Sequence, residues 1–210
     1  MSLTVIEILG RSQEGQTQPY ICRCDDGEVY FVKGRSANRD GLINEWISAR
    51  LCTALHLPIA PYAIATVPEE LIEADLAGQY SALGPGPVFA SLRINATHLT
   101  RPNLRATPQQ LRCDVLIFDW WIHNGDRNLT KLGGNPNLLW SLDTPRTLKM
   151  IDHNLAFDDQ FDATAFFQMH VFSEETNQLF SDFLLRDSYR DRLAQALENW
   201  TDICDTLPEE

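Results

Sequence analysis

Short runs of β-branched, aromatic and other apolar residues occupy the first part of the chain, and they predict β-strands. Three such runs lie at 5–9, 20–24 and 28–33. The last two flank Asp25-Asp26-Gly27, a turn signal, and therefore predict a hairpin. A further apolar run at 88–92 predicts another strand.

Helical periodicity begins at residue 40 and returns in the second half. Apolar residues recur at helical spacing over 40–55, and the helix is expected to end before Pro58 because a residue preceding proline avoids helical geometry. A second helix is predicted to begin at Thr107, with Thr107 as the cap and the following Pro and Gln completing a capping box, and to end near Asn124. The third helical region is predicted to run over 173–200, with a break near 187–188.

Two short strands are expected between these helices, at 138–140 and 147–151. Strands with one helix therefore come first, and helices with a short hairpin follow. This order predicts an α+β fold of two lobes, with a β-rich N-lobe over 1–92 and a helical C-lobe over 93–210, together forming one domain.

Composition narrows the function classes. The 210 residues are 44% hydrophobic and 22% charged, as in ordinary globular domains, and the net charge of −12 argues against general nucleic-acid binding or a membrane-surface role. The five cysteines are scattered, without zinc spacing, and Cys113 falls in an apolar helical pattern where a buried thiol is expected. We expect a reduced, cytoplasmic protein, since neither a leader-like start nor a stretch of transmembrane length is present.

Candidate chemistry starts with Lys33, at the end of a predicted strand, and Glu45 on the next helix. In phosphoryl transfer a strand lysine neutralises nucleotide phosphates, and a helix carboxylate orients that lysine. The competing interpretation is a solvated lysine and a surface glutamate.

Asp126 follows the end of a predicted helix, where its carboxylate could reach a substrate hydroxyl as a general base. The neighbouring Asn124 and Arg127 favour a functional loop. The competing interpretation is a helix-terminal aspartate paired with Arg127.

Two further oxygen-bearing positions are candidate ligands of Mg²⁺, a hard cation that prefers oxygen. One is Asn135 or Asn137, and we favour Asn137 because it directly precedes the apolar run 138–140. The other is Asp152, at the end of the apolar run 147–151. Turn chemistry is the competing interpretation for both asparagines, and an ordinary strand-end turn for Asp152.

These residues resemble the catalytic and metal-binding segments of the HipA-like kinases, with related logic in phosphatidylinositol kinases and the wider protein-kinase-like fold. The resemblance rests on Asn124-Gly-Asp-Arg127, Asn137-Leu-Leu-Trp140 and Met150-Ile-Asp-His-Asn-Leu-Ala-Phe157, preceded by Tyr30-Phe-Val-Lys33 and Asn44-Glu45. It implies ATP and Mg²⁺ as cofactors and transfer of phosphate to a hydroxyl. By that resemblance Asp126 is the base, Asn137 and Asp152 hold the metal, Lys33 contacts phosphate, and Glu45 pairs with Lys33.

The loop Gly10 to Pro19 joins two strands ahead of Lys33, where its backbone amides could cover phosphates. The resemblance assigns nucleotide contact to Gly10, Ser12 and Gly15, and to the strand residues Phe89 and Ala90. It also implies that Ser12 can be self-phosphorylated, as a serine of this loop is in toxin members of the family.

Two departures leave the function open. Kinases place the metal asparagine five residues after the catalytic aspartate; here that position is Lys131, so the assignment of Asn137 requires an insertion over 129–134. The segment at Asp152 reads Asp-His-Asn, where protein kinases have Asp-Phe-Gly. The substrate is therefore a protein or a small molecule, an antitoxin-like or regulatory partner is possible, and a catalytically inactive nucleotide-binding module is the alternative function.

Overall fold

A computed structural model describes residues 3–13, 18–130 and 133–208 of the chain. The chain separates into two compact units. The first comprises Met1–Trp46, Ala60–Ile94 and Leu207–Glu210, and the second comprises Ile47–Ile59 and Asn95–Thr206.

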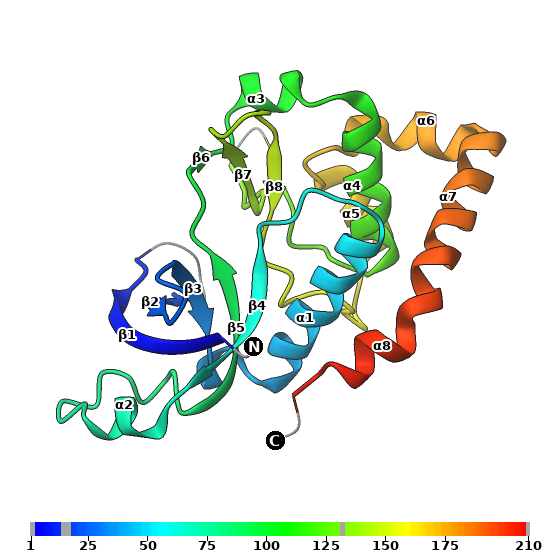
Figure 1. Ribbon diagram of the computed structural model, residues 1–210. Helices are drawn as coiled ribbons and strands as arrows, with labels where there is room; N and C mark the ends of the chain where they lie inside the picture. The colour runs from blue at the N-terminus through cyan, green and yellow to red at the C-terminus, as the bar shows by residue number, and fades with distance from the viewer. Residues whose placement is uncertain (1–2, 14–17, 131–132, 209–210) are drawn as a thin grey trace. The chain divides into compact units, whose positions relative to one another are not determined.

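The first unit is built on a closed five-stranded barrel, coloured blue to green in Figure 1. Its strands follow one another around the barrel in the order β1-β2-β3-β5-β4, and β1 closes it by pairing in parallel with β4. The other pairings are antiparallel. The strands are β1 (Leu3–Arg11), β2 (Tyr20–Cys24), β3 (Val29–Lys33), β4 (Tyr62–Val67) and β5 (Gly86–Leu92).

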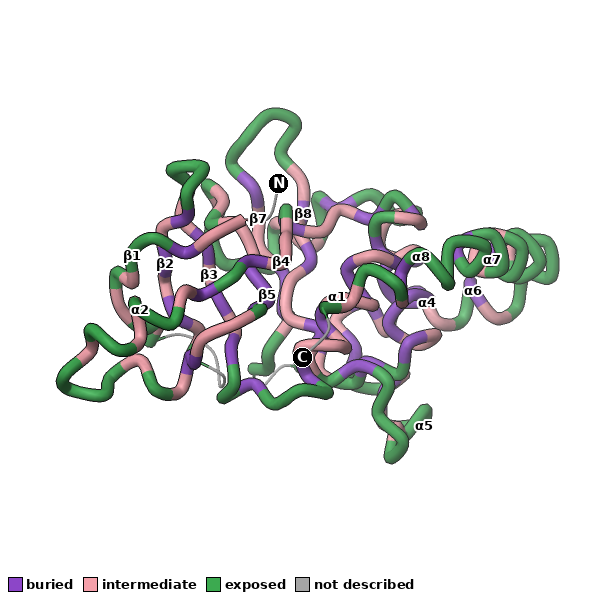
Figure 2. The backbone as a smooth tube through the Cα atoms, turned by 60° about the horizontal axis from the view of Figure 1, so that its bottom comes forward, coloured by how far each residue is buried: buried purple, intermediate pink, exposed green. Residues whose placement is uncertain are grey.

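In β2 and β3 buried residues alternate strictly with partly exposed ones, because successive side chains of a strand point to opposite faces. The buried side chains fill the interior of the barrel. Tyr20, Cys22 and Cys24 of β2 are buried, as are Tyr30 and Val32 of β3, and they form one apolar cluster. The buried stretches of these strands are visible in Figure 2. The next residue after Val32 therefore lies on the outer face of the barrel.

The three predicted N-terminal strands, their hairpin and the strand at 88–92 are all present. Strand β4 and the short helix α2 (Glu69–Glu73) were not predicted, and they lie in a stretch rich in proline and glycine. A short 3₁₀ turn, η1 (Arg35–Ala37), precedes helix α1 (Arg39–Ala54), which confirms the predicted helix over 40–55.

The second unit packs around α4 (Gln109–Trp121), whose Val115, Leu116 and Phe118 are fully buried. A three-stranded antiparallel sheet in the order β6-β7-β8 completes the unit with seven further helical segments of the described chain. The strands are β6 (Ala96–His98), β7 (Leu138–Ser141) and β8 (Leu148–Met150). The helical segments are α3 (Arg101–Ala106), α5 (Ala163–Met169), η2 (Ser173–Glu175), α6 (Thr176–Ser181), α7 (Phe183–Ala196), η3 (Leu197–Asn199) and α8 (Trp200–Asp205).

Two predicted details of this unit are wrong. Thr107 does not cap α4; it ends α3, and its hydroxyl donates to the carbonyl of Asn103 at 2.9 Å. The C-terminal helical region breaks at Asp182 rather than near 187–188, because the Asp182 carboxylate caps α7 by accepting the amide of Leu185 at 3.1 Å.

The mixed α/β class is confirmed by these elements. None of the five cysteines, all of which lie in the described residues, forms a disulfide, and Cys113 is buried in the core of the second unit, as predicted. Among the described residues no helix has the length and apolar character needed to cross a membrane.

Candidate functional site

Lys33 and Glu45 form an ion pair within the first unit. Lys33 lies at the end of β3 on the outer face of the barrel, and its Nζ is 2.5 Å from Oε1 of Glu45 on α1. The Glu45 side chain is only 2% exposed and that of Lys33 10%. The interpretation as a solvated lysine and a surface glutamate therefore does not hold, since a carboxylate this buried needs a cationic partner.

The loop ahead of β2 is closed at its base. Gly10 has a φ of +150° at an irregularity of the β1–β2 pairing, a conformation that glycine adopts without a Cβ clash. The amide of Ser12 donates to the carbonyl of Pro19 at 2.8 Å, which joins the two ends of the loop. Gly15 lies outside the described residues.

Phe89 and Ala90 occupy the centre of β5. Ala90 is fully buried in the barrel and pairs with Val32. Phe89 pairs in register with Lys33 and stacks on Tyr62, with ring centroids 6.0 Å apart and planes inclined by 17°. The register places Phe89 on the same outer face as Lys33.

Within the second unit, the Asp126 carboxylate meets the two candidate asparagines. Its Oδ2 accepts a hydrogen bond from Nδ2 of Asn137 at 2.7 Å and a longer one from Nδ2 of Asn135 at 3.3 Å. Asn137 is buried (6% exposed) while Asn135 is exposed. The structure thus brings the predicted base together with both predicted metal asparagines, and it favours Asn137 as the fixed one.

The insertion between Asp126 and Asn137 folds out and returns. The amide of Asn128 donates to the carbonyl of Asn135 at 3.0 Å, and the Asn135 amide donates to the Asn128 side chain at 3.2 Å. Further out, Thr130 and Gly133 form an isolated β-bridge. The extra residues therefore do not separate Asn137 from Asp126.

Asn137 and Asp152 lie at one end of the β7–β8 pair. Leu138 pairs with Met150, so the residue before β7 and the residues after β8 come together, and the amide of Ile151 donates to the carbonyl of Asn137 at 3.1 Å. Asn137 and Asp152 both have a left-handed backbone, with φ of +46° and +58°. Non-glycine residues rarely adopt this conformation, and it concentrates at functional sites.

The donor set at this end of the sheet suits a hard cation. Because Asp126 is an acceptor, the amide nitrogen of Asn137 must face it, and no described residue donates to the remaining Oδ1. That oxygen and the half-buried carboxylate of Asp152 are the oxygen ligands that Mg²⁺ prefers. No group of three His, Cys, Asp or Glu residues in the described chain could hold a metal by itself, so a cation here would depend on Asn137 and on oxygens of a ligand.

A buried polar network lies behind these residues. Asp119 of α4 accepts from Nε of Arg127 at 2.6 Å, from Nδ2 of Asn124 at 2.8 Å and from Nε2 of His170 at 3.1 Å. Nη2 of Arg127 lies 2.9 Å from Nε2 of His153. All five side chains are buried, and the predicted alternative pairing of Asp126 with Arg127 is wrong, since Arg127 pairs with Asp119.

Two members of the network have shifted pKa values. Burial raises the pKa of Asp119, but the Arg127 guanidinium and His170 more than offset it and hold the pKa well below its ordinary value. For His170, burial lowers the pKa below 6.5 against the opposing pull of Asp119. The Nδ1 atom of His170 accepts the amide of Phe172 at 3.1 Å, which fits a neutral ring with its proton on Nε2.

Asp119, His153 and His170 were not predicted as members of this assembly. One signal was available: Asp119 interrupts an otherwise apolar helical face, and a charged residue in the centre of a buried helix needs a partner. The sequence does not show which residue supplies it.

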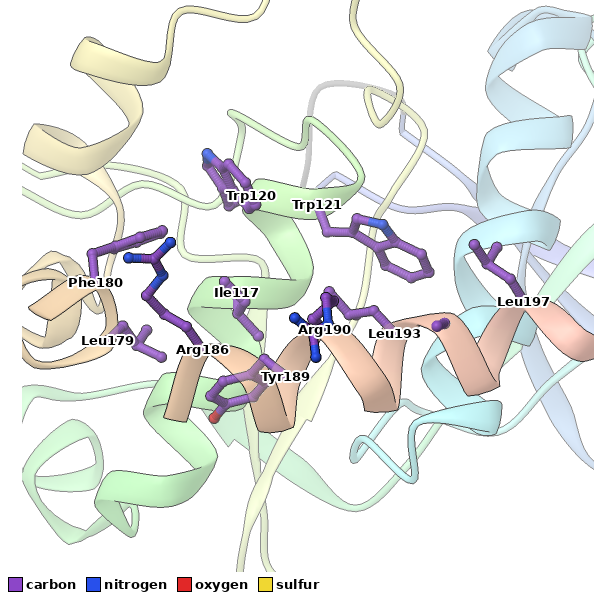
Figure 3. Close-up of a pocket in the computed structure, with 11 residues that line it drawn as sticks. Ile117, Trp120, Trp121, Leu179, Phe180, Arg186, Tyr189, Arg190, Leu193 and Leu197 are labelled. Carbon is purple, nitrogen blue, oxygen red and sulfur yellow. The ribbon is translucent and has the colours of Figure 1, made fainter. Parts of the chain in front are cut away.

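An apolar cavity of about 440 Å³ lies elsewhere in the second unit, between α4, α6 and α7 (Figure 3). Trp120 and Trp121 line it from α4, and they also pack against the core. None of the predicted site residues contributes to its lining.

Comparisons with known proteins address the family. No curated protein matches the chain. Among solved structures, the proinflammatory kinase CtkA of Helicobacter pylori matches with 14% sequence identity and a TM-score of 0.49, covering 90% of this chain and 68% of that one. The family model described as HipA-like kinase matches residues 5–210. The chain, with its Asp126–Asn137 contact and its Lys33–Glu45 pair, belongs to the HipA-like kinase family.

Proposed function

We propose that the protein is an ATP- and Mg²⁺-dependent phosphotransferase that phosphorylates a hydroxyl on a protein or a small molecule. The observation that carries this proposal is the 2.7 Å contact between the Asp126 carboxylate and the Asn137 amide. Phosphoryl transfer uses a base and a metal-binding asparagine, and the residues to which we assign these roles meet across an insertion that separates them in sequence.

Asp126 would act as the base. Its carboxylate is partly exposed, so a substrate hydroxyl can approach it, and the Asn137 amide fixes its orientation. The hydroxyl oxygen forms a bond to the γ-phosphorus of ATP while the bond from that phosphorus to the β-phosphate oxygen breaks. The hydroxyl proton passes to Asp126, and ADP leaves.

Asn137 and Asp152 would hold the metal through Oδ1 and a carboxylate oxygen. Mg²⁺, when bound, neutralises the charge of the nucleotide phosphates. Both residues have a left-handed backbone. This conformation costs free energy and concentrates at functional sites, which supports the assignment of both residues as ligands.

In the first unit, Lys33 would contact phosphate and Glu45 would orient it. The Lys33 side chain keeps 10% of its surface exposed, which supports approach by a ligand. The loop with Gly10, Ser12 and Gly15 would cover the phosphates, and Phe89 and Ala90 of β5 would contribute to nucleotide binding.

The architecture proposed for this chemistry is the two-lobed protein-kinase-like fold, with a β-rich N-lobe over residues 1–92 and a helical C-lobe over 93–210. Membership of the HipA-like kinases supports it. The same membership supports an antitoxin-like or regulatory protein partner and self-phosphorylation of Ser12; incubation with Mg-ATP followed by mass spectrometry should find added phosphate on Ser12.

The test compares Asp126→Asn with Asp159→Asn, a control at an exposed aspartate of the same unit. Labelled ATP is incubated with a lysate, and thermal stabilisation by Mg-ATP is measured in parallel. We expect Asp126→Asn to lower transfer by about 10²–10⁴-fold while the thermal shift persists, because loss of a general base affects chemistry more than binding. Asp159→Asn should behave as wild type.

Other outcomes have distinct meanings. Mg-ATP at 100 times its dissociation constant adds about 2.7 kcal/mol of stability, so a wild-type protein without any shift would sink the proposal. A shift without transfer would favour the catalytically inactive nucleotide-binding module instead.

A further inference from the structure

The geometry points to Arg127 as the positioning residue of this site: its buried guanidinium fixes the backbone that carries both candidate metal ligands. The inference rests on the proposed function, because the two ligands are those assigned there. Arg127 cannot touch a substrate itself, since its side chain is 0% exposed.

Every nitrogen of the guanidinium is engaged. Nε donates to Asp119, Nη2 contacts His153, and Nη1 donates to the main-chain carbonyl of Asn137 and, at 3.3 Å, to that of Pro136. A longer contact of 3.5 Å joins Nη1 to the carbonyl of Ile151. One planar cation thus ties the base loop, the segment before β7 and the segment after β8.

The contacts lie at and beside residues with a left-handed backbone, which non-glycine residues rarely adopt. Asn137 has φ of +46°, and its own carbonyl accepts from Arg127. Asp152 has φ of +58°, and the residues on both sides of it, Ile151 and His153, contact the same guanidinium. Left-handed conformations persist when surrounding contacts over-determine them, and Arg127 supplies those contacts at both positions.

Asp119 holds the guanidinium, and His170 holds Asp119. Asp119 projects from α4, and His170 reaches it from the end of α5. The carbonyl of Arg127 accepts the amide of Val171 at 3.1 Å, and Asn128 forms a β-bridge with His170. The base loop is therefore fastened to the same network from its main chain as well as from its side chain.

Stability alone does not explain this arrangement. A buried ion pair can usually be replaced by apolar residues at little cost in stability, because desolvation consumes most of the Coulomb gain. What an apolar pair could not supply is a rigid fork of donors toward acceptors on three segments. Lysine could not supply it either, since it offers a single nitrogen.

The test is Arg127→Lys, with Arg112→Lys as the matched control. Arg112 also forms an arginine–carboxylate pair in the second unit, with Glu175 at 2.7 Å, but it contacts none of the three segments. Amide hydrogen exchange of Ile151, whose N–H donates to Asn137, is measured alongside transfer as a function of Mg²⁺ concentration.

We expect Arg127→Lys to accelerate exchange at Ile151 and to raise the Mg²⁺ concentration for half-maximal transfer about 10–100-fold, as for residues that orient metal ligands. Arg112→Lys should change neither quantity. A folded Arg127→Lys protein with wild-type exchange and Mg²⁺ dependence would overturn the inference and leave the proposed function standing. A wild-type protein that transfers no phosphate would sink the proposed function, and the exchange measurement would still test Arg127.

If Arg127→Lys does not yield folded protein, two variants of His153 test the inference instead. His153→Leu removes the acceptor for Nη2, whereas His153→Gln offers an amide oxygen in its place. We expect the Mg²⁺ dependence to shift in the leucine variant and to recover in the glutamine variant. Identical behaviour of the two variants would refute the positioning role.

Discussion

The two units each contain a buried ion pair, and the pairs differ in what surrounds them. The Lys33 and Glu45 side chains of the first unit are 10% and 2% exposed, so the lysine retains contact with solvent. The Asp119 and Arg127 side chains of the second unit are both 0% exposed, and further buried polar groups bond to them.

This difference separates two uses of a buried charge. A cation with remaining access can meet a ligand, and its carboxylate partner serves to direct it. A cation whose every nitrogen is bonded to the protein can only organise its neighbours. The difference in burial is consistent with the ligand contact proposed for Lys33 and with the positioning role inferred for Arg127.

The largest effect is expected from removing one partner of the fully buried Asp119–Arg127 pair. Asp119→Leu leaves the Arg127 charge buried without its carboxylate and should cost about 3–5 kcal/mol of unfolding free energy, measured by urea denaturation. The double variant Asp119→Leu/Arg127→Met removes both buried charges and should recover part of that stability, since Asn124 and His170 still lose the carboxylate to which they bond. It should not recover phosphate transfer. A double variant with wild-type transfer would show that the network has no role in positioning.

The next effect separates the two asparagines that contact Asp126. Asn137→Ala removes the buried amide at 2.7 Å and the proposed metal ligand, so transfer at fixed Mg²⁺ should fall about 10²-fold, equivalent to about 2.7 kcal/mol in the barrier. Asn135→Ala removes an exposed amide at 3.3 Å and should change the rate by less than about threefold, since long exposed hydrogen bonds contribute little. The reverse order of effects would assign the metal to Asn135.

Breaking the Lys33–Glu45 pair should cost less unfolding free energy than breaking the Asp119–Arg127 pair. Lys33→Met removes the lysine that pairs with Glu45. Because the Lys33 side chain is partly exposed to water, we expect a loss of only about 2 kcal/mol of unfolding free energy, measured by urea denaturation. Lys33→Met should also weaken the thermal shift by Mg-ATP. A Lys33→Met protein with undiminished Mg-ATP stabilisation would contradict phosphate contact by Lys33.

The smallest effect concerns pH. The pKa of His170 is lowered on folding, so the unfolded chain binds a proton at pH values where the folded one does not. Stability contributed by the neutral ring is complete above pH 6.5 and is lost as pH falls below it, by at most about 1.4 kcal/mol per pH unit. Asp119, whose pKa is also lowered, adds a loss below pH 3.8. Chemical denaturation of His170→Gln should lack the first of these losses; an equally steep decline between pH 6.5 and 5 would assign it to another group.

Local patterns predicted the elements that carry their own signals. The strands at 20–24 and 29–33 follow from two β-rich runs around the turn signal at 25–27, and α1 follows from its helical period. Strand β4 and helix α5 were missed because β4 lies in a proline- and glycine-rich stretch and α5 has only seven residues, too few for a clear period. The break at Asp182 was missed for a related reason: a single capping carboxylate within a helical pattern looks like any other surface charge.

The sequence by itself determined the order of the chemical groups: a strand lysine, a helix glutamate, an aspartate after a helix, and an asparagine and an aspartate on either side of a hairpin. Those assignments depend on local spacing, which a chain carries without folding. Only the tertiary structure decided that the insertion returns Asn137 to Asp126, and that Arg127 bonds to Asp119 rather than to its neighbour Asp126. Such pairings depend on which segments pack together, and burial makes each unmatched charge or hydrogen bond costly enough to select one arrangement.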